Sequence, residues 1–172
     1  QQQIDYGDCF LEWRNSINAS HDNLLNLVAE QTKTLVKNLA DGGSWPDITV
    51  IVHSRDFGYD LTQTLRKFNI QTTHTFGGPD SRRASIEQKK LEQRKKQAFT
   101  LVSDRVKVTT INSAKGLEAR GIIVVLGLSR STEVASLAYT AITRVKASYR
   151  GSALVVLNAI ERFESAAQLV RD

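Results

Sequence analysis

The residues best suited to chemistry follow a short apolar segment near the middle of the chain. Thr110, Ser113 and Lys115 lie in a polar run that continues through Gly116 to Glu118. Hydroxyl groups, an ammonium group and backbone amides beside a glycine can bind an anionic polymer or the phosphates of a nucleotide. The same composition also fits an ordinary polar loop between two elements, so this run by itself leaves both interpretations open.

A second candidate is Arg144, which follows Glu118 by 26 residues. Its surroundings, residues 133–147, have apolar side chains at helical spacing, so we expect an arginine deep in a helix whose other face is buried. Such an arginine either forms a salt bridge at the rim of the helix or contacts a phosphate. The fixed fork of guanidinium donors suits the second role.

Other reactive side chains are scattered along the chain. Cys9, His21, His53 and His74 are not spaced as zinc ligands, so no metal site is expected, and no Ser-His-Asp constellation is recognisable. Residues 81–98 contain seven Lys or Arg and two Glu, a local net charge of +5. This basic stretch predicts either a solvated helix without a partner or a surface that binds an acidic one.

Hydrophobic patterns predict the elements that must position these residues. Short, nearly continuous apolar segments indicate strands buried on both faces, and apolar residues at helical spacing indicate amphipathic helices. The expected strands are 47–52, 71–76, 106–111, 121–128 and 152–157, and the expected helices are 20–39, with Ser20 or Asp22 as N-cap, 56–68, 133–147 and 160–170. This alternation predicts an α/β fold with a mostly parallel sheet, and function in loops at the carboxyl ends of its strands.

Length and composition limit the class of protein. The chain has 172 residues and a mass of 19.2 kDa, with 41% apolar and 24% charged residues, which is typical of one soluble globular domain. No apolar run approaches the roughly 20 residues of a membrane span, so no membrane association is expected. A single cysteine, Cys9, favours a reducing, cytoplasmic setting. The lack of methionine and the start at Gln1 suggest a fragment of a longer chain.

Three segments resemble the motifs of one helicase family. VKVTTINSAKGLEA (106–119) is similar to motif V, LAYTAITRVK (137–146) to motif VI and ITVIVHSR (48–55) to motif IV of UvrD/Rep-type superfamily 1 DNA helicases. They occur in that family's order. The resemblance implies that residues 1–172 form a single C-terminal RecA-like domain, a three-layer α/β sandwich of the P-loop NTPase fold. The basic insert, 79–104, stands where larger relatives carry an accessory domain.

The family's nucleotide-contacting roles can be transferred residue by residue. The resemblance implies that Arg144 is the catalytic arginine finger, which stabilises charge on the γ-phosphate of ATP in the transition state. It also implies that Gly116 and Glu118 lie at the nucleotide, where the carboxylate is similar to one that contacts the ribose. Tyr139 is expected to support the motif VI helix by packing.

The resemblance further implies that Thr110, Ser113 and Lys115 contact single-stranded DNA. ATP and Mg²⁺ are the implied cofactors, yet the sequence has no G-x-x-x-x-G-K-[ST] loop and no acidic magnesium motif. The Mg²⁺ ligands are therefore expected outside this chain, in an N-terminal P-loop RecA-like domain of the same protein. The predicted function is the C-terminal motor domain of an ATP-dependent, 3′–5′ helicase or translocase, which does not hydrolyse ATP without the P-loop domain.

Three departures from the usual motifs support a different function. Asn112 stands where the family usually has histidine, Ala119 where it has an aromatic residue, and His53 where it has arginine. The alternative is a non-catalytic, helicase-like module that binds nucleic acid or an acidic protein through its basic segment, 82–96.

Overall fold

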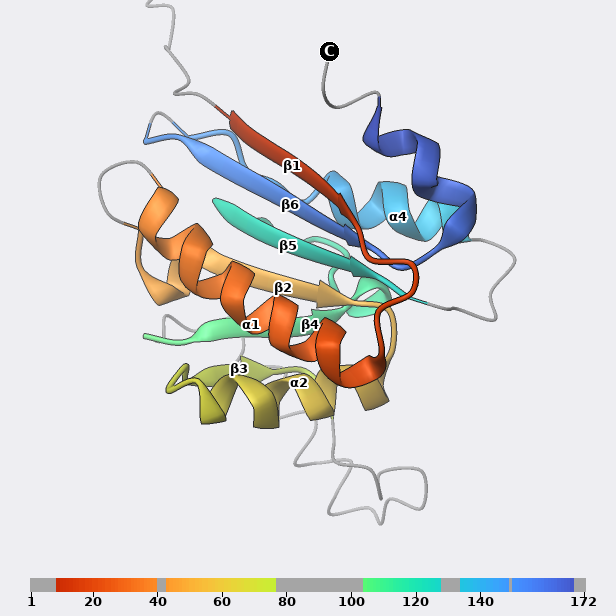
Figure 1. Ribbon diagram of the computed structural model, residues 1–172. Coiled ribbons are helices and arrows are strands. Elements are labelled where there is room, and N and C mark those ends of the chain that lie inside the picture. The colour runs from red at the N-terminus through yellow and green to blue at the C-terminus, as the bar shows by residue number, and fades with distance from the viewer. Residues whose placement is uncertain (1–8, 40–42, 77–103, 128–133, 149, 169–172) are drawn as a thin grey trace, which may run out of the picture.

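The fold is built on a single six-stranded sheet, seen in a computed structural model that describes residues 9–39, 43–76, 104–127, 134–148 and 150–168 (Figure 1). Every paired strand runs parallel to its neighbour. Across the sheet the strands are β1 (Cys9–Asn15), β6 (Ser152–Asn158), β5 (Gly121–Leu126), β2 (Ile48–Val52), β4 (Val106–Thr110) and β3 (Thr72–His74). The predicted α/β fold with a parallel sheet is confirmed, and it is consistent with a RecA-like domain.

The central strands are buried along their whole length. Every residue of β2, β5 and β6 is buried, and these strands are rich in valine, isoleucine and leucine. β-branched side chains favour extended backbone, and a parallel strand needs apolar side chains on both faces because both faces are covered. The continuous apolar segments of the sequence therefore became the central strands, as predicted.

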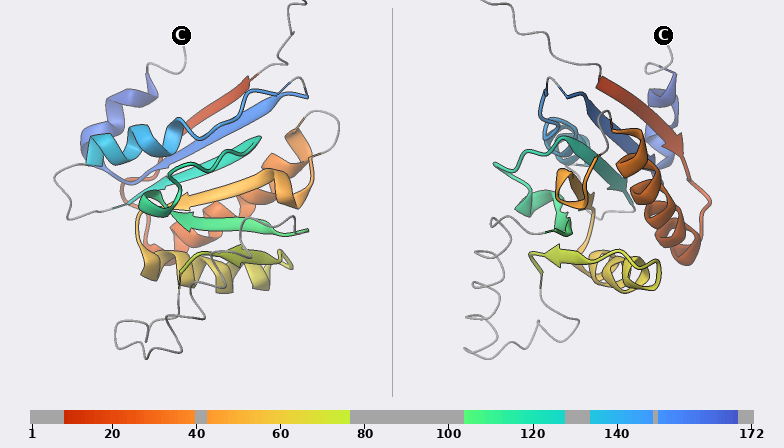
Figure 2. Two further views of the ribbon diagram at one scale, coloured as in Figure 1. Left: turned by 180° about the vertical axis from the view of Figure 1, so that it is seen from behind. Right: turned by 90° about the vertical axis from the view of Figure 1, so that its left-hand side faces the viewer.

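Helices cover both faces of the sheet and create two apolar cores. Helices α1 (His21–Asn38) and α2 (Arg55–Lys67) lie on the face toward the viewer in Figure 1. Helix α4 (Val134–Ile142) and the 3₁₀ helix η3 (Ile111–Ser113) lie on the opposite face, seen from behind in Figure 2. Alternate residues of the strands serve the two cores: Val50 and Val52 pack with α1 and α2, whereas Ile51 packs with α4.

Serine side chains mark where the first two helices begin. The Ser20 Oγ accepts a hydrogen bond from the Asn23 backbone N–H at 3.2 Å, and the Ser54 Oγ accepts one from the Phe57 N–H at 3.2 Å. Each bond satisfies a backbone donor that the first turn of a helix leaves unpaired. Of the two N-caps proposed for α1 from the sequence, Ser20 is the one observed. A further short 3₁₀ helix, η1 (Trp45–Asp47), leads into β2.

The structure corrects the sequence-based elements at three places. Strand β1 was not predicted, because its segment, CFLEWRN, lies at the sheet edge and leaves Phe10 and Leu11 exposed, without the apolar pattern of a buried strand. The predicted closing helix, 160–170, is a 3₁₀ helix, η4 (Glu161–Ala167). The predicted helix 133–147 ends at Ile142, because the following residues turn and pair with the segment around Ala119.

Two further predictions, the basic insert and the absence of a membrane span, can be compared with the structure only within the described residues. Residues 79–103 of the basic insert, which include the segment 82–96, lie outside the described residues. Within the helices that the structure describes, none is long and apolar enough to cross a membrane.

Candidate nucleotide and nucleic-acid interface

The polar run after β4 begins with a buried hydroxyl. Thr110 is the last residue of β4, and only 9% of its surface is exposed. Its Oγ1 donates a hydrogen bond to the Ser113 Oγ at 3.2 Å, and its carbonyl accepts one from the Ala114 N–H at 2.9 Å. The structure therefore brings Thr110 and Ser113 together, and Ser113, at the end of η3, is the more accessible of the two.

The next two residues form an exposed turn. Lys115 and Gly116 are both exposed, and the Leu117 N–H closes the turn by donating to the Ala114 carbonyl at 2.9 Å. Gly116 has a φ of +82°, a left-handed conformation that glycine adopts without strain. No carboxylate among the described residues pairs with Lys115, so its ammonium group is available to an external anion.

The segments around Glu118 and Arg144 are joined by backbone hydrogen bonds. The Ala119 N–H donates to the Arg144 carbonyl at 3.2 Å, and the Lys146 N–H donates to the Ala119 carbonyl at 2.8 Å, which makes a parallel bridge between Ala119 and Val145. Glu118, the residue before this bridge, is exposed. The two segments that resemble motifs V and VI are thus in direct contact.

One apolar core holds both segments in place. Ile111 and Ala114 of the polar run are buried in the same cluster as Ala138 and Ala141 of α4, and Val145 packs against it. Burial of these side chains fixes how α4 lies over η3, because close-packed interiors tolerate little displacement. The chemistry-bearing residues are therefore positioned by packing behind them.

Arg144 lies in the turn that follows α4, two residues beyond the helix end, and not deep in a helix as the sequence had suggested. Its Nε donates to the Thr140 carbonyl at 3.1 Å, and its Nη2 donates to the Thr143 Oγ1 at 3.1 Å. These bonds hold a half-buried guanidinium against the end of α4. Within the part of the chain that the structure describes, Arg144 forms no ion pair, so its positive charge is uncompensated.

Tyr139 has a different environment from the one expected. The prediction that it packs in support of the helix is wrong, since 72% of its surface is exposed. Helical geometry explains the difference: Ala138 and Ala141 point toward the sheet, which places Tyr139 on the outer side of α4.

His53, just after β2 in the segment that resembles motif IV, is half-buried. Its ring lies 4.9 Å from the Phe57 ring between centroids, and its Nδ1 is buried without a hydrogen-bond partner. Burial lowers the pKa of His53 below its ordinary 6.5, the carbonyl of Val125 partly opposes this, and nearby His21 lowers the pKa further. A half-buried imidazole whose pKa is lowered is poorly suited to bind a phosphate.

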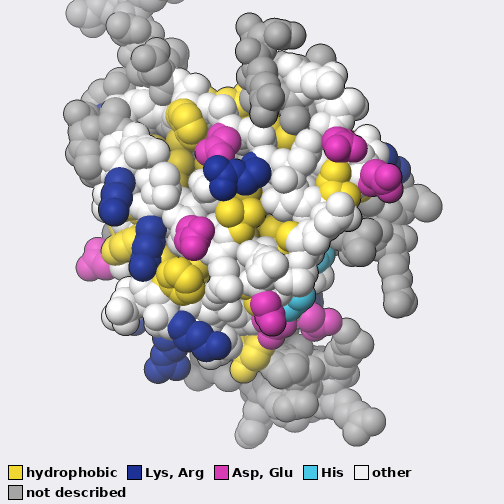
Figure 3. Space-filling view, in the orientation of Figure 1, with side chains coloured by type: hydrophobic (Ala, Val, Ile, Leu, Met, Phe, Trp, Pro, Cys, Tyr) yellow, Lys and Arg dark blue, Asp and Glu magenta, His cyan; other side chains and the backbone are white. Residues whose placement is uncertain are grey.

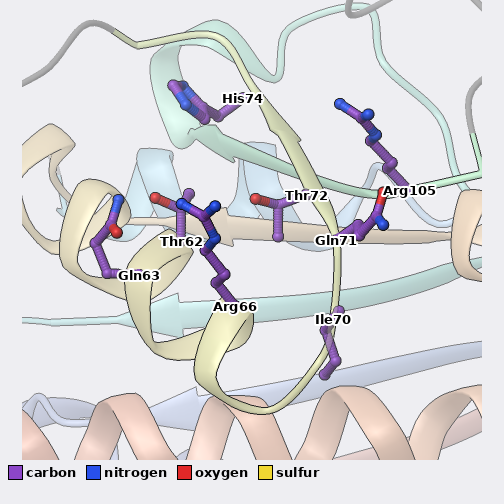
Figure 4. Close-up of a pocket in the computed structure, with 8 residues that line it drawn as sticks. All are labelled: Thr62, Gln63, Arg66, Ile70, Gln71, Thr72, His74 and Arg105. Atoms are coloured by element: carbon purple, nitrogen blue, oxygen red, sulfur yellow. The ribbon is translucent and has the colours of Figure 1, made fainter.

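A polar pocket beside edge strand β3 was not predicted from the sequence (Figure 4). Its volume is about 340 Å³, and its lining residues are Thr62, Gln63, Arg66, Ile70, Gln71, Thr72, His74 and Arg105. These residues come from α2, from β3 and the turn before it, and from the residue that precedes β4, and no local pattern in the sequence connects them. Over the described ranges, no three His, Cys, Asp or Glu side chains are grouped as a metal site.

Comparison with known proteins supports the fold. The sequence matches no protein-family model and no curated protein. The structure is similar to the crystal structure of the C-terminal domain of a possible DNA helicase from Lactobacillus plantarum WCFS1, with a TM-score of 0.51 and 18% identity over 96% of this chain and 85% of that one. At this identity the similarity concerns the fold alone, which this chain shares with that C-terminal domain.

A second structure, the C-terminal part of the Fun30 ATPase domain, has 12% identity and a TM-score of 0.48, too low to carry an argument. Its match covers 89% of this chain and 47% of that one. Neither similarity points to the UvrD/Rep type in particular.

Proposed function

We propose that this chain is the C-terminal motor domain of an ATP-dependent DNA helicase or translocase. The observation that carries the proposal is the backbone bridge between Ala119 and Val145, which joins the segments that resemble motifs V and VI. A motor of this kind needs its nucleotide-sensing and nucleic-acid-binding segments to move as one body. A direct bridge with a shared apolar core meets that requirement.

In this proposal Arg144 acts as the arginine finger. Its guanidinium is held by Thr140 and Thr143 at the end of α4 and has no carboxylate partner in the described ranges, so it can stabilise the charge that develops on a γ-phosphate. Glu118 is exposed beside the same bridge, where it can accept hydrogen bonds from a ribose. ATP would bind between this domain and an N-terminal P-loop domain of the same protein, which would supply the Mg²⁺ ligands.

The grip on single-stranded DNA is assigned to the polar run after β4. Lys115 is exposed on the turn at Gly116 and can pair with a phosphate, and Ser113 can donate a hydrogen bond to one. Thr110 donates its own hydroxyl proton to Ser113, so its contribution is to orient that side chain. The polarity of movement, 3′–5′, and the superfamily 1 assignment rest on the resemblance of the motifs.

The test is the ATPase activity of the complete protein, measured with and without single-stranded DNA, for wild type and Arg144→Ala. Where arginine fingers have been removed, the rate falls by about 10³- to 10⁵-fold. We expect a loss in that range, with nucleotide binding retained. Lys146→Ala is the matched control, because Lys146 is an exposed cation two residues away whose backbone, not its side chain, forms the bridge.

Three results would contradict the proposal. Robust ATP turnover by the isolated 172-residue chain would show that no P-loop domain is needed. Unchanged turnover of the complete Arg144→Ala protein, or no turnover in wild type, would favour the alternative of a non-catalytic binding module, which the substitutions at Asn112, Ala119 and His53 support.

A further inference from the structure

The pocket beside β3 is lined almost entirely by polar and positively charged groups. Arg66 comes from the last turn of α2, Thr72 is the first residue of β3, and Arg105 precedes β4. Figure 4 shows the two arginines on either side of Thr72, with His74 further along the strand. Ile70 is the one aliphatic residue of the lining.

The two arginines carry charge that no neighbouring carboxylate balances. Among the described residues neither Arg66 nor Arg105 forms an ion pair, and the pocket lining contains no Asp or Glu. Asp104 precedes Arg105 in the chain without pairing with it. On the space-filling surface, Lys and Arg side chains gather over the C-terminal end of α2, and acidic side chains lie toward its other end (Figure 3).

Hydrogen-bond donors are placed around the charges. Gln63 and Gln71 contribute side-chain amides, and Thr72 contributes a hydroxyl. His74 is fixed at the far end, where its Nδ1 lies 2.7 Å from the Phe76 carbonyl and its ring stacks on Phe76 at 4.7 Å between centroids. Two guanidinium groups with surrounding amides and a hydroxyl form a site suited to phosphate oxygens.

The lining also indicates what kind of phosphate compound fits. A pocket for a small molecule is lined mostly by apolar and aromatic side chains that bury the ligand. The only aliphatic residue of this lining, Ile70, is 1% exposed and packs in the core, and an imidazole lies at the end of the pocket, so the pocket can bind the phosphates of a ligand better than its base or ring. A polynucleotide backbone, which extends beyond the pocket in both directions, meets that description.

The position of the pocket connects it with the polar run after β4. Strand β3 pairs with β4 so that Thr72 lies opposite Val106, four residues before Thr110, and His74 lies opposite Val108, two residues before it. With a rise of about 3.3 Å per residue and about 4.8 Å between strands, Thr72 is roughly 14 Å and His74 roughly 8 Å from the level of Thr110. A nucleic acid bound at Ser113 and Lys115 can therefore continue past the end of β3 toward the pocket.

We propose that Arg66, Arg105 and Thr72 form a second contact site for the phosphodiester backbone of single-stranded DNA, at the β3 edge of the domain. The site rests on the proposed function for its choice of polymer, but its residues are separate from the motif-like segments. It binds without regard to base sequence, since its donors face phosphates. It lengthens the track of DNA held by this domain beyond the loop after β4.

The experiment measures binding of a fluorescein-labelled oligodeoxythymidylate of about 20 nucleotides by anisotropy, between about 50 and 300 mM NaCl. Each phosphate contact to a single strand contributes about 0.7 to the slope of log affinity against log salt. We expect the slope to decrease by about 0.7 for Arg66→Gln or Arg105→Gln and by about 1.4 for the double variant. Lys67→Gln, next to Arg66 on α2 but outside the pocket, should leave the slope unchanged.

Lys115→Gln is measured in parallel to separate this site from the loop after β4. If the pocket variants keep the wild-type slope while Lys115→Gln lowers it, the second site is refuted and the proposed grip remains. If only the pocket variants lower it, the second site stands and the proposed role of Lys115 fails. Wild type that does not bind the oligonucleotide also overturns the second site. Unchanged thermal unfolding of the variants confirms that they are folded.

Discussion

Gly127, the residue after β5, leaves room for the ring of His53 at the end of β2. A Cβ at position 127 would lie 2.2 Å from the His53 Cε1, 2.3 Å from its Nδ1 and 2.6 Å from its Nε2. All three distances are far below van der Waals contact, and the Phe57 ring packs against the same imidazole, 4.9 Å away between ring centroids. Gly127→Ala should therefore force the ring or the strand end to move. Overpacking of this kind costs about 1–3 kcal/mol.

Thermal unfolding of four proteins tests this reasoning: wild type, Gly127→Ala, His53→Ala and the double variant. For a chain of this size, 1 kcal/mol corresponds to about 2–4 °C in Tm, so the single Gly127→Ala change should lower Tm by about 2–12 °C. If the clash with His53 is the cause, Gly127→Ala should cost far less when His53 has also been replaced by alanine. An equal cost in both backgrounds would show that something other than the His53 ring limits position 127.

Three further predictions concern stability. The pKa of His53 is lowered in the folded chain, so the unfolded chain binds the proton first as pH falls, and the free energy of unfolding should decrease below the ordinary pKa of 6.5. His53→Gln should reduce this decrease. Urea unfolding midpoints at about pH 7.5 and 5.5 measure it. The buried Arg120 side chain donates a hydrogen bond from its Nε to the Gly151 carbonyl at 2.7 Å. Arg120→Ala should therefore lower the free energy of unfolding by about 2–4 kcal/mol. A decrease below about 1 kcal/mol in denaturant unfolding would contradict that role. Ser20→Ala removes the α1 cap and should cost about 1 kcal/mol, whereas Ser20→Asp should not, by the same measurement.

The local sequence pattern was sufficient to predict an element whose own side chains determine how it is buried. The segment Ile48–Val52 is β-branched and apolar throughout, and it became a central strand with both faces covered. The helix that precedes it begins at Ser20, one of the two N-caps expected from the sequence. Such features depend on the period of the side chains and on unpaired backbone groups, which a short stretch of sequence already contains.

Pairing between segments far apart in the chain could not be predicted from the sequence. Strand β1 exists because residues 9–15 pair with 152–158 at the sheet edge, and its exposed Phe10 and Leu11 gave no burial pattern to read. Helix α4 ends at Ile142 because the chain beyond it pairs with Ala119. In both places the free energy comes from backbone hydrogen bonds to a distant segment, which no local preference encodes.

The candidate sites divide in the same way. The sequence by itself placed Thr110, Ser113, Lys115, Gly116 and Glu118 in one polar run, at the end of a predicted strand and in the loop after it, because they are neighbours in the chain. Only the tertiary structure decided that this loop is hydrogen-bonded to the segment of Arg144, and that Arg66 and Arg105 flank one pocket. The reason is physical: parallel strands joined through helices bring together residues that are far apart in sequence, and the packing of the whole sheet sets which ones meet.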